Sequence, residues 1–177
     1  MEATNQYRSN YAGFHHLDVF TNILREIMIR NISPELLYNK HVKDKSIHLK
    51  MFDKITFKED ESINTLKNRT YDDIGFTTLY TLIRMCSILN APTQGWGRQP
   101  KNADVTISDD VERLRNMRSK IVDCIKEDMD FIEMNDYFSN ILNISQRIDT
   151  YLCKLPDQGF TREVHKLQTH STACFLK

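Results

Sequence analysis

Apolar residues recur along the chain at intervals of three and four positions, which is the spacing of one face of an α-helix. Few segments alternate apolar and polar residues as a half-buried strand does. The pattern predicts long helices over about 11–31, about 72–89, from near Ser108 onward, and over about 132–154. Short helices are expected from Pro34 to about His41 and over about 46–53. We therefore predict an all-α fold, a four-helix up-and-down bundle with short helical insertions.

Two helix starts carry capping signals. Ser33-Pro34-Glu35 places a hydroxyl at the N-cap, a proline at the first helical position and an acid in the first turn. Ser108 is the expected cap of the next-to-last helix, and the two aspartates that follow it suit the positive end of the helix dipole.

The clearest loop covers residues 92–100 and holds the only tryptophan, Trp96, between two glycines. Trp96 is expected to fill a groove between helices; alternatively, its ring contacts a partner protein or stacks on a base. Residues 8–155 are expected to form one domain, because 177 residues fit an ordinary domain size. Residues 156–177 carry few apolar side chains and are expected to form a loosely ordered C-terminal tail.

Composition narrows the class of protein. Lysine plus arginine equal aspartate plus glutamate at 24 each, so the chain lacks the overall positive charge of a dedicated nucleic-acid binder. The four cysteines form no CxxC pair, which argues against a zinc ribbon and favours reduced, mostly buried thiols. No stretch is apolar enough to span a membrane, and the polar N-terminus is unlike a signal peptide. We expect a cytoplasmic protein with no metal and no cofactor.

Arginine interrupts the apolar seam of the next-to-last helix. The spacing from Val111 and Leu114 to Ile121 calls for an aliphatic residue where Arg118 stands. Further cations lie close by on the same helix, namely Arg113, Arg115 and Lys120. These residues are candidates, together with Trp96, for contact with RNA or with an anionic partner. A solvated helix face is the more common explanation for such a cluster. For Arg118, a side chain that extends toward water or pairs with a buried acid explains the position as well as an interface role does.

Four stretches of the chain share their order and spacing with a known family. They are Leu24–Ile27 with Ile32–Tyr38, Thr78–Arg84, the run from Leu89 to Arg115 that includes Gly95-Trp96, and Asn135–Ile141. Together they resemble the HEPN domain of the type found in the DAZ-interacting zinc-finger ubiquitin ligase. The resemblance covers roughly residues 8–154.

The resemblance implies a scaffold related to metal-independent ribonucleases, whose next-to-last helix carries Arg-Asn and then His five or six positions later. Histidine moves protons near neutral pH, and arginine holds the anionic phosphate. Here the arginine falls on Arg118, the asparagine position holds Ser119, and the histidine position falls on Asp123 or Cys124. Neither replaces an imidazole, since a carboxylate repels phosphate and a thiol is a poor proton carrier near pH 7.

The resemblance therefore implies a domain without catalytic residues, which acts by self-association or by docking another protein, for instance as an adaptor in defence signalling. The alternative is a residual metal-independent endoribonuclease or RNA-binding domain. The chain is also compatible with a fragment of a larger multidomain protein, since the family usually appears fused to other domains.

Overall fold

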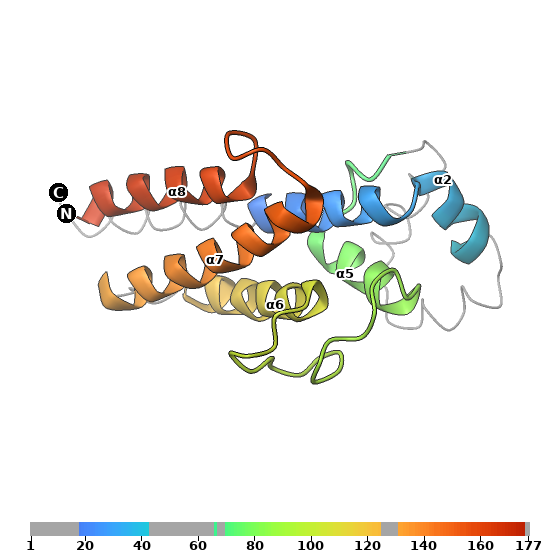
Figure 1. Cartoon of the computed structure of the whole chain (residues 1–177), viewed down its shortest axis with the longest axis horizontal. Coiled ribbons are helices and arrows are strands. Elements are labelled where there is room, and N and C mark those ends of the chain that lie inside the picture. Colours follow the sequence, from blue (N-terminus) through green and yellow to red (C-terminus); the bar gives the residue numbers. More distant parts are fainter. Residues whose placement is uncertain (1–17, 43–65, 67–69, 125–130, 176–177) are drawn as a thin grey trace. The chain divides into compact units, whose positions relative to one another are not determined.

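The computed structural model describes residues 18–42, 66, 70–124 and 131–175. Every regular element within these ranges is helical, which confirms the all-α prediction (Figure 1). The chain divides into two compact units: unit 1 contains the described residues up to Phe20 and those from Pro92 onward, and unit 2 contains those from Thr21 to Ala91. The predicted helix over 46–53 lies outside the described residues, and the count of four principal helices stays a prediction.

The first described helix covers residues 18–31, and unit 2 contains it from Thr21 onward. Its predicted apolar face is buried, including Leu24, Ile27 and Met28. Helix α2 (Pro34–Leu37) begins as predicted, since the hydroxyl of Ser33 accepts a hydrogen bond from the N–H of Leu36 at 3.3 Å. A π-helical turn, η1 (Tyr38–Val42), continues it. None of the helices in the described part of the chain has the length and apolarity that a membrane crossing needs.

Helix α5 (Phe76–Met85) is shorter at both ends than the predicted 72–89. It starts after Gly75, which has extended backbone geometry, and it ends at Cys86 because Ser87 adopts a left-handed φ of 51°. The predicted apolar positions Leu79, Leu82 and Ile83 are nonetheless fully buried. Periodicity thus located the buried face correctly and overestimated the length of the helix.

Unit 1 is built on helices α6 (Ile107–Cys124), α7 (Phe131–Leu152) and α8 (Phe160–Phe175), with α7 lying between the other two (Figure 1). Helices α6 and α7 are antiparallel, because Asp110 near the start of α6 bonds to Arg147 near the end of α7. Their predicted seams are buried at Val111, Leu114, Met134, Phe138, Ile141 and Ile148. This pair carries the polar network described below.

Helix α8 lies where the sequence indicated a loosely ordered tail. Phe160 and Val164, one helical turn apart, are 2% and 0% exposed, so this segment packs an apolar stripe into unit 1. Its start is held by Asp149 of α7, which accepts hydrogen bonds from the backbone N–H groups of Phe160 at 2.8 Å and Thr161 at 2.9 Å. The few apolar residues suffice because a distant carboxylate caps the helix.

The expectation of mostly buried thiols holds for Cys86 and is wrong for Cys153, which is exposed after the last residue of α7. Burial raises the pKa of Cys86 to about 11, against a smaller lowering by Lys40, so this thiol stays protonated at neutral pH. The side chains of Cys124 and Cys174 lie outside the described residues.

Candidate functional site

The loop over 92–106 is fastened at both ends to one buried carboxylate, that of Asp109. Its oxygens accept hydrogen bonds from the backbone N–H of Thr93 at 2.7 Å, from the hydroxyl of Thr93 at 2.8 Å and from the N–H of Thr106 at 3.0 Å. The hydroxyl of Thr106 in turn accepts from the N–H of Asp109 at 3.2 Å. This reciprocal capping arrangement makes Thr106 the cap of α6, so the prediction of Ser108 is wrong.

The next turns of α6 hold the middle of the loop. Glu112 is fully buried and accepts a hydrogen bond from the N–H of Gly97 at 2.8 Å. The side-chain amide of Asn116 donates to the side-chain carbonyl of Gln99 at 2.6 Å. Gly95 and Gly97 have φ values of 85° and 83°, in the left-handed region that favours glycine, and Trp96 between them is half-buried. The loop is therefore a fixed structure without regular secondary elements.

A third buried acid joins the two helices of the pair. Arg147 of α7 donates to both oxygens of Asp110, from Nε at 2.7 Å and from Nη2 at 2.6 Å. Arg113 donates to the same carboxylate at 3.0 Å. The two-pronged geometry from Arg147 is the strong form of a guanidinium–carboxylate pair, and these hydrogen bonds raise the pKa of Arg147 above its ordinary value.

Two of the arginines predicted to contact RNA or a partner are engaged within unit 1. Arg113 also donates to the backbone carbonyls of Lys101 at 2.6 Å and Asp104 at 2.5 Å, and its side chain is only 15% exposed. Arg115 pairs with Glu112 at 3.2 Å and is 40% exposed. The structure thus assigns Arg113 to loop anchoring and leaves Arg115 partly accessible.

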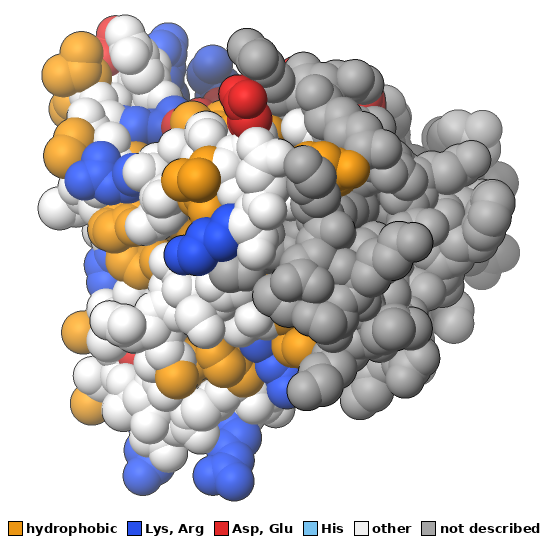
Figure 2. Space-filling model, turned by 90° about the vertical axis from the view of Figure 1, so that its right-hand side faces the viewer, with side chains coloured by type: hydrophobic (Ala, Val, Ile, Leu, Met, Phe, Trp, Pro, Cys, Tyr) orange, Lys and Arg blue, Asp and Glu red, His pale blue; other side chains and the backbone are white. Residues whose placement is uncertain are grey.

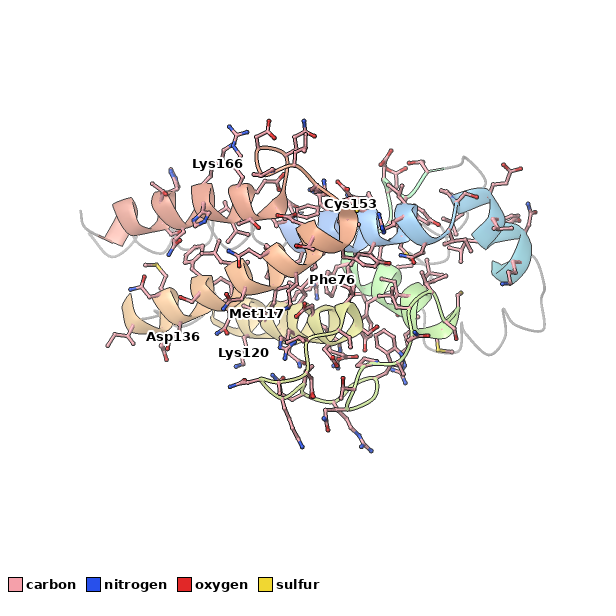
Figure 3. All side chains as sticks on the ribbon, viewed as in Figure 1. Phe76, Met117, Lys120, Asp136, Cys153 and Lys166 are labelled. Carbon is pink, nitrogen blue, oxygen red and sulfur yellow. The ribbon has the colours of Figure 1, made fainter. Side chains whose placement is uncertain are left out.

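The remaining predicted site residues lie further along α6. Arg118 is half-buried, Ser119 and Lys120 are exposed, and Lys120 points away from α7 (Figure 3). Asp123 and Cys124 belong to the last turn of α6, and their side chains lie outside the described residues. On the face drawn in Figure 2, lysine and arginine side chains stand among apolar and uncharged ones.

Histidines within the described ranges lie away from α6 in the sequence. His165 and His170 are both exposed on α8. Among the residues that the structure describes, no three histidine, cysteine, aspartate or glutamate side chains gather to hold a metal ion.

Asp109 links the stability of the loop to pH. Burial raises the pKa of this carboxyl group, but hydrogen bonds from Thr106 and Thr93 outweigh burial and hold the pKa below its ordinary value. A carboxyl group with a lower pKa in the folded than in the unfolded chain stabilises the fold above its unfolded pKa of about 3.9. That contribution is lost as the pH falls through the folded pKa.

We expect Asp109→Asn to lower the free energy of unfolding by about 1–3 kcal/mol near neutral pH, because an amide group then faces hydrogen-bond donors. The difference from the wild type should shrink below about pH 4. Thermal melts of both proteins over a pH series measure this difference in stability. The other carboxyl groups are the same in both proteins, so their contributions to the pH dependence cancel. A difference that stays constant down to the acid limit would contradict the role of Asp109.

A comparison with known protein families identifies the domain that contains these residues. The family model for the DZIP3/hRUL138-like HEPN domain matches residues 34–172. The chain belongs to this family. The match extends through most of α8, beyond the domain end expected at residue 155. No curated protein and no solved structure matches the chain.

Sequence reasoning missed the residues that organise this HEPN domain. Asp109, Asp110 and Glu112 are each fully buried, although their order in the sequence suggested only charges near a helix start. Arg147 was not singled out at all. The available signal was the stripe of polar residues at positions 109, 112, 113 and 116, which lie on one side of a helix just after a glycine-rich loop.

Proposed function

We propose that this HEPN domain is a non-catalytic interaction module that works by docking protein partners, itself included, as an adaptor in defence signalling. The observation that carries the proposal is the composition of α6, on which the family's catalytic motif falls. No histidine occurs in residues 107–124, so the helix lacks the group that moves protons near neutral pH.

The bonding of the acids supports the same conclusion. Asp109, Asp110 and Glu112 are the carboxylates nearest the start of α6, and each accepts hydrogen bonds from the loop or from arginine. A carboxylate whose oxygens are occupied by such internal hydrogen bonds does not face a substrate, so it is not placed to act as a general acid or base. The polar groups in this half of α6 therefore serve to fix a loop shape, which suits recognition rather than chemistry.

The test is an incubation of labelled RNA with the purified protein and with Arg118→Ala, in the presence of a chelator. We expect no cleavage above background from either protein, since loss of a general acid or base lowers rates by about 10²- to 10⁴-fold. A filter-retention assay on the same samples reports RNA binding.

Lys166→Ala, on the exposed surface of α8, is the matched control. Cleavage by the wild type and by Lys166→Ala that disappears in Arg118→Ala would overturn the proposal and establish the ribonuclease alternative. RNA retention that depends on Arg118 without cleavage would establish an RNA-binding domain instead.

A further inference from the structure

The loop over 92–106 presents a basic surface to solvent. Arg98 and Lys101 are both exposed, whereas the one acidic side chain of the loop, that of Asp104, is half-buried. The carboxylate of Asp104 accepts hydrogen bonds from the side-chain amide of Gln94 at 2.9 Å and from the N–H of Lys101 at 2.8 Å. Val105 adds an aliphatic side chain that is 55% exposed. The zero net charge of the chain therefore conceals a local excess of positive charge on this loop.

A third cation, Arg115 of α6, lies beside the same part of the loop. The buried carboxylate of Glu112 accepts a hydrogen bond from the N–H of Gly97 at 2.8 Å on one oxygen and from Arg115 at 3.2 Å on the other. The guanidinium group of Arg115 and the backbone just before Arg98 therefore meet around one carboxylate. Glu112 is fully buried and Arg115 is 40% exposed, so a partner in solvent reaches the cation and not the acid.

Buried charges hold this surface in one shape. Asp109 and Glu112 are fully buried, and an ionised group costs free energy to bury unless hydrogen bonds satisfy it. Arg113 donates to the backbone carbonyls of Lys101 at 2.6 Å and Asp104 at 2.5 Å, which fixes the turn between these two residues. A loop that is already fixed loses little conformational freedom when a partner binds, so more of the contact energy appears as affinity.

We propose that the surface formed by Arg98, Lys101, Val105 and Arg115, here called the basic loop surface, docks an acidic segment of another protein. The two guanidinium groups match the geometry of carboxylates, and the lysine adds a compact positive charge. Val105 contacts an aliphatic side chain of the segment. The inference rests on the proposed function, because it names the surface and the chemistry of a docking partner.

Carboxylates fit the basic loop surface better than a nucleic acid does. Proteins that bind single-stranded RNA stack its bases on accessible aromatic rings. Trp96 is the one aromatic residue of the loop and is half-buried, while the exposed apolar side chain is that of Val105, which has no flat face. Affinity for a duplex grows with the number of phosphates that cations neutralise, and this surface offers only three cations.

The experiment measures binding of a fluorescein-labelled peptide, in which glutamates and aspartates surround one leucine, to the full chain by fluorescence polarisation. The wild type binds this peptide, and high salt weakens the binding. A peptide with glutamine and asparagine in place of the acids binds about ten-fold more weakly or less. The variant Arg98→Glu with Lys101→Glu, which reverses the charge of the loop, lowers affinity for the acidic peptide by about ten-fold or more.

The matched control is Arg162→Glu with Lys166→Glu, which makes the same charge change on exposed positions of α8, across α7 from α6 (Figure 1). It leaves the affinity within about two-fold of the wild type, because salt screens distant charges. Circular dichroism checks that each variant is folded. If the loop reversal unfolds the chain, Arg98→Gln with Lys101→Gln decides in its place, with affinity lowered by about three-fold or more.

Single-stranded and double-stranded RNA, labelled in the same way, are the competing probes. RNA that binds more tightly than the acidic peptide, and loses affinity on the loop reversal, assigns the surface to nucleic acid and overturns the inference. Failure of the wild type to bind the peptide at low salt, or equal binding by the loop-reversed variant, also overturns it. An equal loss in the α8 control does the same. The proposed function fails on different results, namely RNA cleavage or RNA retention that depends on Arg118.

Discussion

Asp110→Ala is expected to lower the free energy of unfolding by about 3–5 kcal/mol, the largest effect of any single substitution that we consider. The carboxylate is fully buried and is shared by Arg147 and Arg113, whose side chains are 32% and 15% exposed. Removing it leaves two partly buried guanidinium groups without the carboxylate that neutralises their charge. The hydrogen-bonded link between α6 and α7 is lost, and Arg113, which anchors the loop, loses the carboxylate that holds its guanidinium group.

Thermal melts measure the loss, and Asp73→Ala, at an exposed turn position, is the control with an expected change within about 0.5 kcal/mol. A second variant identifies the cause. Asp110→Leu combined with Arg147→Met removes both charges and replaces them with apolar groups, so it should recover much of the stability. If the double variant is as unstable as Asp110→Ala, the charge pair is not the origin of the effect.

The helices that the sequence predicted well are those whose stability comes from an apolar seam of their own. The buried faces at 18–31, α5, α6 and α7 follow the spacing of apolar residues, and the start at Ser33 follows from a local capping signal. Such features depend on residues within one or two turns of each other, which is the range that periodicity can detect.

The features that the sequence did not predict depend on bonds between distant residues. Charged residues are assumed to be exposed unless a partner is known, and the partners of Asp110 include Arg147, 37 positions later. Arg113 was interpreted as a surface cation for the same reason, although its guanidinium contacts carbonyls 9 and 12 positions earlier. In the same way, the sequence does not reveal that Arg98 and Lys101 of the loop are exposed while the acids at the start of α6 are buried.

Helix α8 is the clearest case, and Gly159→Ala tests its anchoring. A methyl group added at Gly159 would collide with the carboxylate of Asp149, which caps the helix. The substitution is expected to lower the free energy of unfolding by about 2–4 kcal/mol, through steric overlap and loss of the cap. Amide hydrogen exchange should accelerate in α8 more than in α6, because the helix loses its attachment to α7.

Gly75→Ala is the control, since its added methyl group meets no atom within 4 Å and the expected change is below about 1 kcal/mol. Asp149→Ala alone should destabilise by about 0.5–2 kcal/mol, the usual loss for a helix cap. When Gly159→Ala is combined with Asp149→Ala, it should cause little further loss of stability, because the carboxylate that obstructs the methyl group is absent. Additive losses would mean that Gly159 is needed for a reason other than its contact with Asp149.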